Sequence, residues 1–167
     1  MLAEFAKVRE GRPADAEALA KLFRESWLLA YQGIIPQAHL NAMIARRAPA
    51  WWRSGLARRG GSIILDVKGV VAGYATYGAS RWPGRQQAEI YELYLTPVYQ
   101  GLGLGERLFE SARQRIDAMR LDGLIVWALS DNSAACDFYR RRGGRVLARR
   151  SEQFGGTTLP KTAFGWD

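Results

Sequence analysis

One segment in the middle of the chain constrains the fold most: a buried strand that passes through glycines directly into a helix. Residues 88–95 read AEIYELYL, a run typical of a buried strand. Gly101, Gly103 and Gly105 follow, and residues 104–119 repeat apolar side chains at helical spacing. Glycines let a backbone approach a ligand closely, and the free amides at a helix start attract anions. The segment therefore predicts a phosphate-binding loop between a strand and a helix.

Two common nucleotide-binding motifs do not fit this loop. A Walker loop ends in Gly-Lys-Ser/Thr, whereas this one ends in Gly105-Glu106-Arg107. The dinucleotide fingerprint G-x-G-x-x-G requires a glycine where this chain has Glu106. A glycine-rich turn without a ligand is the alternative that the loop by itself leaves open.

The remaining pattern predicts an α+β fold with helices on both faces of a mixed sheet. Strands are expected at residues 5–9, 62–67, 70–77, 88–95, 124–129, 145–150 and 159–166. Helices are expected from Pro13 to Gly33, over 40–44 and 51–56, and over 104–119 and 132–142. The sequence contains no repeat, low-complexity tract or Pro/Ser-rich linker, so residues 1–167 are interpreted as a single domain.

The composition favours an ordinary globular protein and narrows the classes of site. Apolar residues make up 48% of the 167 residues and charged residues 24%, and the formal net charge is +8. No apolar stretch approaches the roughly 18 residues of a membrane span, and the N-terminus does not resemble a secretory signal, so the cytoplasm is the expected compartment. One cysteine, Cys136, and one histidine, His39, argue against a disulfide framework and a metal site. The positive charge suits a polyanionic cofactor. The sequence lacks the dense basic run with interleaved aromatics that is typical of proteins binding single-stranded nucleic acid.

A second segment, residues 127–143, reads WALSDNSAACDFYRRRG and predicts a strand end followed by a helix. Asn132, Ala135 and Tyr139 have the spacing i, i+3, i+7 and share one helix face, while Phe138 turns toward the core. Asn132 is also a favourable residue for the helix N-terminus.

Together the two segments resemble the GNAT acetyltransferases. The run Gln100-Gly101-Leu102-Gly103-Leu104-Gly105 matches the family pattern Q/R-x-x-G-x-G/A, and residues 93–97 are similar to its fourth strand. The second segment is similar to the family's N-x-x-A-x-x-F-Y helix, and residues 25–36 resemble the first-helix region that lines the acceptor pocket. The resemblance implies a mixed, mostly antiparallel GNAT-type sheet and acetyl-CoA as co-substrate, with no metal.

The resemblance also implies roles for particular residues. The amides after Gln100 would hold the diphosphate of coenzyme A, and the backbone of the fourth strand would pair with its pantetheine arm. The implied cofactor-binding residues are Leu93, Leu95, Gln100, Gly101, Leu102, Gly103, Leu104, Gly105, Asn132 and Tyr139. Residues 140–142, three arginines, suit either the 3′-phosphate or a solvated surface.

Acetyl transfer to an amine needs a proton donor for the thiolate and a base for the ammonium. Tyr139 is the candidate acid, with a core tyrosine as the alternative. Glu92 and Glu89 are the candidate bases, with Glu92 nearer the thioester end; they face opposite sides of a regular strand, unless a bulge changes the parity. Trp27, Tyr31 and Tyr77 are candidates for the acceptor pocket or for the core.

These residues predict direct transfer from acetyl-CoA to a primary amine in a ternary complex. The acceptor classes that stay open are a small amine, an amino acid, an antibiotic and a protein N-terminus. The alternative is a non-catalytic acyl-CoA-binding or regulatory module, and a homodimer is one open oligomeric state. Cys136 has no histidine nearby in sequence and is interpreted as a packed residue, not a nucleophile. Lys161 stands where related chains often carry an acid, so the C-terminal tail is assigned no catalytic role.

Overall fold

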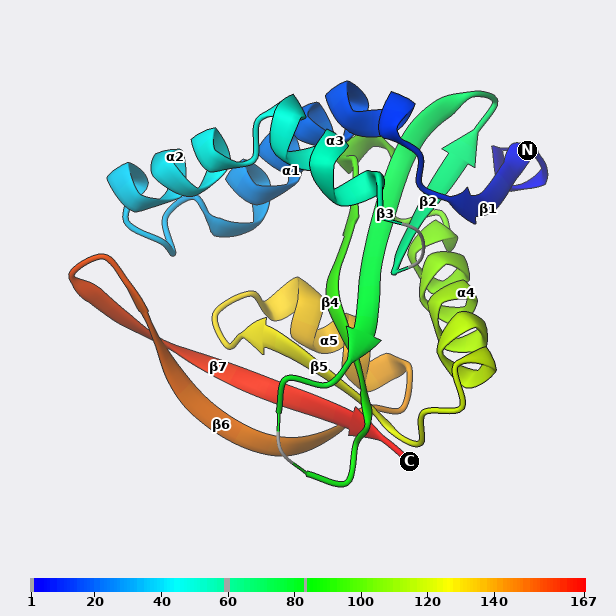
Figure 1. Cartoon of the computed structure of the whole chain (residues 1–167). Helices are drawn as coiled ribbons and strands as arrows, with labels where there is room; N and C mark the ends of the chain where they lie inside the picture. Colours follow the sequence, from blue (N-terminus) through cyan, green and yellow to red (C-terminus); the bar gives the residue numbers. More distant parts are fainter. Residues whose placement is uncertain (1, 59–60, 83) are drawn as a thin grey trace.

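A seven-stranded sheet organises the computed structural model, which describes residues 2–58, 61–82 and 84–167 (Figure 1). The strand order is β1-β2-β3-β4-β5-β7-β6. The strands are β1 (Ala6–Glu10), β2 (Ser62–Val67), β3 (Val70–Ala79), β4 (Ala88–Leu95), β5 (Leu124–Leu129), β6 (Arg145–Phe154) and β7 (Thr157–Trp166). The glycine loop leaves the sheet at β4, in the centre of this order.

All neighbouring strands run antiparallel except β4 and β5, which run parallel. The parallel pair is short, because only Ala88–Ile90 pairs with Leu124–Val126. Beyond Ile90 the two strands separate, although β4 continues to Leu95 and β5 to Leu129. This separation opens the sheet at the end of β4 where the glycine loop begins. The mixed, mostly antiparallel sheet predicted from the sequence is confirmed.

Helices cover both faces of the sheet (Figure 1). The helices α1 (Ala16–Tyr31), α2 (Gln37–Arg46) and α3 (Pro49–Leu56) lie on one side, here called the α1 face. On the opposite side, here called the α4 face, α4 (Leu104–Ala118) and α5 (Ser133–Arg141) pack against the sheet. Short 3₁₀ turns at Leu2–Phe5, Pro13–Asp15 and Pro97–Tyr99 precede β1, α1 and the glycine loop. Within residues 2–58, 61–82 and 84–167, no helix is long and apolar enough to cross a membrane.

Apolar residues on the two faces form separate clusters. On the α4 face, Leu108 and Phe109 of α4 pack with Tyr139 of α5 and Phe164 of β7. On the α1 face, the cluster joins aromatic side chains of the helices to the middle of the sheet, with Phe23, Trp52, Ile64 and Tyr74 at its centre. The alternation of side chains along each strand therefore decides which face a residue serves.

The C-terminal hairpin is longer than the sequence pattern predicts. Strand β6 continues past Arg150 to Phe154, and β7 begins at Thr157. Nearly every residue of β6 is exposed or half-exposed, because β6 is the edge strand; the exception is Phe154, which packs against His39 of α2. Such a strand carries neither an apolar run nor a regular alternation, and so its full length leaves no clear signal in the sequence.

Candidate functional site

A cleft of about 670 Å³ lies where β4 and β5 separate. Its walls come from α1, the end of β4, the glycine loop, the start of α4, and the loop and helix that follow β5. The residues predicted for the cofactor that line it are Leu93, Leu95, Gln100, Gly101, Gly103, Gly105, Asn132 and Tyr139. Leu102 is instead half-exposed, and the Leu104 side chain is buried in the core beneath α4.

The last residues of β4 turn their backbone polar groups toward this cleft. The Thr96 N–H donates to the Ala72 carbonyl of β3 at 2.8 Å. Because alternate residues of an antiparallel strand bond to opposite sides, Leu95 and Leu93 direct their N–H and C=O groups away from β3. The Leu95 carbonyl accepts from Ser26 Oγ at 3.3 Å and Gln100 Nε2 at 3.2 Å. The cleft therefore has a strand edge along one wall that β5 does not cover.

The glycine loop presents backbone amides to the same cleft. Gly101 and Gly103 have φ values of +76° and +77°, a left-handed conformation that other residues rarely adopt. Gly103 is the N-cap of α4 and has no side chain to satisfy the amides of the first turn. At Gly105 a Cβ atom would lie 3.3 Å from Phe138 Cε2, so this glycine lets the loop approach α5 closely. The helix dipole and these amides favour an anion here.

Helix α5 contributes the second wall. Asn132 caps the helix, because its Oδ1 accepts the Ala135 N–H at 3.2 Å. Tyr139 is 6% exposed and packs between Phe109 and Phe164 while it lines the cleft. Burial raises the pKa of Tyr139 above its usual value of 10.0, which keeps the phenol protonated. Arg141 and Arg142 also line the cleft, and Arg142 lies 3.5 Å from Glu106.

A β-bulge in β4 places both candidate carboxylates on the α1 face. Thr76 of β3 pairs with Glu92 whereas the next residue, Tyr77, pairs with Ile90, so β4 has one extra residue at Tyr91. In a regular strand the spacing of three would place Glu89 and Glu92 on opposite faces, and the extra residue places them on the same face.

The two carboxylates have different surroundings. Glu89 is 1% exposed and accepts from the backbone N–H, Nε and Nη2 of Arg81. Glu92 accepts from Arg47 Nη1 at 3.0 Å through Oε1 only. Its Oε2 is buried and has no hydrogen-bond partner in the described part of the chain. Glu92 therefore retains a free oxygen, and Glu89 does not.

The aromatic candidates separate into two groups. Trp27 and Tyr31 belong to an aromatic layer beneath α1, where the Tyr31 hydroxyl lies 2.5 Å from the hydroxyl of Tyr94. Tyr94 lines the cleft, so Tyr31 touches the wall of the cleft from behind. Burial raises the pKa of both tyrosines, so both phenols stay neutral. Tyr77 instead lies on the α4 face in the core cluster and does not line the cleft.

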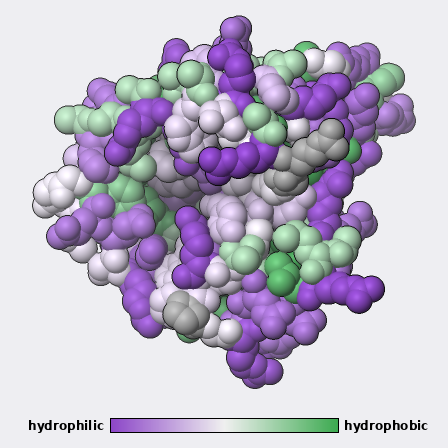
Figure 2. All heavy atoms as spheres, viewed as in Figure 1, coloured by the Kyte–Doolittle hydropathy of each residue, from purple (hydrophilic) through white to green (hydrophobic). Residues whose placement is uncertain are grey.

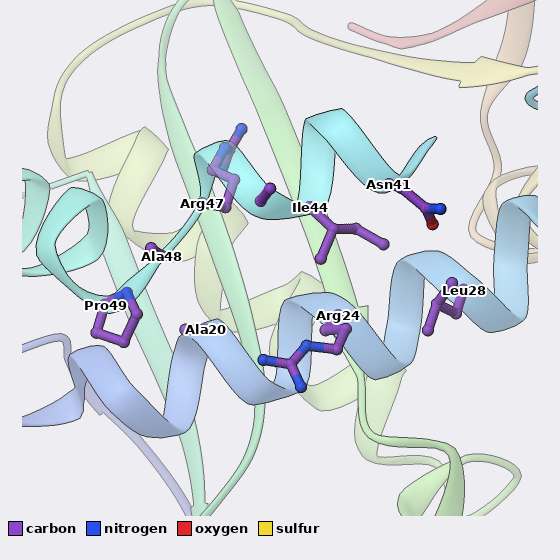
Figure 3. Close-up of a pocket in the computed structure, with 9 residues that line it drawn as sticks. Ala20, Arg24, Leu28, Asn41, Ile44, Arg47, Ala48 and Pro49 are labelled. Atoms are coloured by element: carbon purple, nitrogen blue, oxygen red, sulfur yellow. The ribbon is translucent and has the colours of Figure 1, made fainter. Parts of the chain in front are cut away.

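A second pocket, of about 350 Å³, lies between α1 and α2 (Figure 3). Arg24 and Asn41 point from the two helices, and Arg47 lies where α2 ends. The Arg47 guanidinium lies 3.9 Å from the centre of the Trp51 ring. This stacking, together with the ion pair to Glu92, fixes Arg47 between the helices and the sheet.

Sequence patterns alone did not single out Ser26, Arg47 or Tyr94 for a role. In the sequence, Ser26 interrupts the apolar stripe of α1, which is a signal for a buried polar contact. In the structure its exposed fraction is 3%, and its hydroxyl donates to the Leu95 carbonyl. Arg47 looks like a surface arginine in the sequence, and only the fold brings it to Glu92. Cys136 is buried and its thiol lies 3.6 Å from the Leu129 carbonyl, in agreement with a packed residue. In the residues that the structure describes, no group of three or more His, Cys, Asp or Glu is placed to hold a metal.

Comparisons with known proteins agree with this geometry. The N-acetyltransferase YuaI of Bacillus subtilis is 27% identical over 160 residues, which cover 95% of this chain and 91% of YuaI. The L-amino acid N-acyltransferase MnaT of Escherichia coli is 27% identical, covering 85% of this chain and 81% of MnaT. The solved PaiA N-acetyltransferase of Thermoplasma acidophilum, in complex with coenzyme A, is similar in fold with a TM-score of 0.76 at 20% identity, covering 94% and 97% of the two chains.

The family model described as "Acetyltransferase (GNAT) family" matches residues 17–144. That range includes α1, the separated strands, the glycine loop and α5. The prediction made from the two sequence segments is thus confirmed, and the chain belongs to the GNAT family of acetyl-CoA-dependent acyltransferases.

Proposed function

We propose that this protein transfers an acetyl group from acetyl-CoA directly to a primary amine, in a ternary complex formed by one acetyltransferase domain over residues 1–167. The observation that carries the proposal is the cleft itself, which joins an uncovered strand edge, free helix amides and the Tyr139 phenol. The open acceptor classes are a small amine, an amino acid, an antibiotic and a protein N-terminus. The similarity to an L-amino acid N-acyltransferase supports the second of these.

The residues of the cleft fit the parts of coenzyme A. The amides at the start of α4 hold the diphosphate, because they have no intrahelical partners and lie at the positive end of the helix dipole. The backbone groups of Leu93 and Leu95 pair with the pantetheine amides as an added strand would. Arg141 and Arg142 provide positive charge for the remaining phosphate. When bound, acetyl-CoA supplies the thioester whose acetyl group is transferred.

Glu92 is the proposed base. Arg47 occupies Oε1 and leaves Oε2 as a buried acceptor without a partner, a condition that buried water usually relieves. Tyr74 Oη and Trp27 Nε1 are buried on the same face and also have no partner in the described residues. A water held among these groups carries the proton of the acceptor ammonium to Glu92. Glu89 is assigned a structural role, since Arg81 supplies all its donors.

Tyr139 is the proposed donor to the departing sulfur. A thiol has a pKa of about 8.5, so a nearby proton donor stabilises the departing thiolate as it forms. Because burial raises the pKa of Tyr139, this donor is present throughout the physiological pH range. The position of Tyr139 in the wall of the cleft, opposite the end of β4, supports this role.

Thiol release with a panel of primary amines tests the proposal. The panel contains an amino acid, a polyamine, an aminoglycoside and a short peptide, each mixed with enzyme and acetyl-CoA. The proposal predicts amine-dependent release of free thiol with at least one of them. Calorimetric binding of acetyl-CoA without thiol release from any amine would favour the non-catalytic acyl-CoA-binding module instead.

A further inference from the structure

The α1 face of the sheet continues beyond Glu92 onto β5, β7 and β6. There Leu129, Leu159 and Phe154 pack with residues of α1 and α2, whereas Trp127, Lys161 and Arg150 lie outside that cluster. Trp127 of β5 pairs with Ala163, and Lys161 of β7 pairs with Leu129 and with Arg150 of β6. Strand alternation puts Trp127, Lys161 and Arg150 on the same face as Glu92. Figure 2 shows the face seen in Figure 1 hollowed near its centre, with both hydrophilic and hydrophobic residues around the hollow.

Four side chains on this surface form a continuous row of cations and aromatic rings. The Arg150 guanidinium lies 4.8 Å from the centre of the Trp82 ring. Trp82 meets Trp127 edge to face, with ring centres 5.2 Å apart. Lys161 Nζ lies 4.6 Å from the centre of the Trp127 ring. We call Arg150, Trp82, Trp127 and Lys161 the cation–aromatic row.

The charges on this surface are unequally compensated. Arg81 neutralises Glu89, Arg47 neutralises Glu92, and Lys161 lies 3.5 Å from Glu152. Arg150 has no carboxylate partner among the residues that the structure describes, and one of its N–H groups donates to the Arg149 carbonyl at 2.9 Å. Its exposed guanidinium therefore retains donors that can bind an anion.

We infer that the cation–aromatic row is the subsite for a carboxylate on the amine acceptor, with Arg150 as its principal ligand. This inference rests on the proposed function, and it narrows the acceptor to amino acids with an apolar or aromatic side chain. Arg150 binds the carboxylate through its planar fork, and Lys161, which is paired with Glu152, lies beside it. The two tryptophan rings provide apolar surface for the acceptor side chain. The uncompensated guanidinium of Arg150 beside the site repels a polyamine.

The register of the strands places the Trp127 end of the row nearest the proposed base, while Arg150 lies on β6, two strands beyond β5. Ile90 of β4 pairs with Val126 of β5, so Trp127 lies one residue further along, level with the bulge that precedes Glu92. An acceptor held by the cation–aromatic row thus extends toward the gap between β4 and β5, where the cleft opens. The sequence assigned Lys161 no catalytic role, and in this subsite Lys161 contributes to the specificity for the acceptor.

Two amines that differ only in the carboxylate test the inference: L-phenylalanine and 2-phenylethylamine. For each, kcat/KM is measured by thiol release, and binding to the enzyme with coenzyme A is measured by calorimetry. The wild-type protein is expected to prefer L-phenylalanine about tenfold or more, as a charge-assisted contact allows. Arg150→Met is expected to remove most of this preference, mainly through a higher KM for the amino acid.

Arg149→Met is the matched control, because Arg149 is the neighbouring exposed arginine and points to the opposite face of β6. The inference is wrong if both variants change the preference equally, if L-phenylalanine does not bind, or if spermidine binds more tightly than L-phenylalanine. Turnover of amines without a preference for a carboxylate would overturn this inference alone. A complete lack of turnover would contradict the proposed function, while the calorimetry would still test the subsite.

Discussion

Replacement of Gly103 by alanine tests whether the left-handed turn of the glycine loop shapes the cofactor site. Gly103 has a φ of +77°, and a Cβ atom there would meet no atom within 4 Å. The substitution therefore adds backbone strain without a steric clash. A left-handed conformation costs an L-residue about 1–2 kcal/mol.

Gly69→Ala provides a control with the same strain. Gly69 lies in the turn between β2 and β3, with a φ of +83° and nothing within 4 Å of the added Cβ. Gly69 does not line the cleft. Gly69→Ala should lose about 1–2 kcal/mol of stability, which lowers the melting temperature by about 2–8 °C. Gly103→Ala should lose less stability if its loop relaxes in the free protein, because coenzyme A must then restore the left-handed turn and the cost appears in binding.

Calorimetric titration with coenzyme A measures the difference between these two glycines. If Gly103→Ala relaxes the free loop, binding must recover about 1–2 kcal/mol, so affinity falls about 5- to 30-fold. Gly69→Ala should bind coenzyme A as the wild-type protein does. Equal affinities for Gly103→Ala and wild type, with the melting temperature of the variant also unchanged, would refute the role assigned to this turn.

Three further predictions concern the chemistry and the stability of the protein. Tyr139→Phe should lower kcat about 10²-fold or more and change coenzyme A affinity little, as measured by thiol release and calorimetry. The raised pKa of Tyr139 should move its alkaline loss of activity above pH 10, so kcat should not fall between pH 8 and 10 through this group. Arg9→Met should cost about 2 kcal/mol in urea unfolding at pH 7, because Arg9 pairs with Asp15 and Asp66 at 2.9 Å and 3.0 Å.

Each of the two substitutions has an outcome that contradicts its prediction. A Tyr139→Phe enzyme with wild-type kcat would exclude the phenol as the donor. The Arg9 effect should shrink in acid: although burial opposes it, the hydrogen bonds from Arg9 lower the pKa of Asp15 below its usual 3.8. The stabilisation is therefore present above that pH and is lost as the pH falls through the lowered value. A loss of stability that is equal at pH 7 and pH 2.5 would argue against the ion pair as its cause.

Local patterns were sufficient to predict most elements and the position of the glycine loop. Residues 88–105 contain an apolar strand, the proline Pro97 after the strand end, and three glycines. Each of these constrains the backbone without contacts to distant residues. The Asn132 cap is likewise local, since its acceptor lies three residues from the donor. The family resemblance then linked these two segments to one cofactor.

Features that depend on partners far apart in the chain were not predictable from the sequence. The bulge at Tyr91 depends on the pairing of β3 with β4, and it alone places Glu89 beside Glu92 on one face. Arg47 reaches Glu92 across 45 positions of sequence. Tyr77 lies in the core because its strand alternates toward α4, a choice that aromatic character cannot reveal. Sheet register therefore decides which face of the sheet each candidate serves.

A crystal structure of the protein with coenzyme A tests the central claim most directly. The account predicts diphosphate oxygens at about 3 Å from the backbone nitrogens of residues 101–106, and pantetheine amides paired with Leu93 and Leu95. A coenzyme whose diphosphate lies away from the start of α4, with those amides bound to other groups, would contradict it.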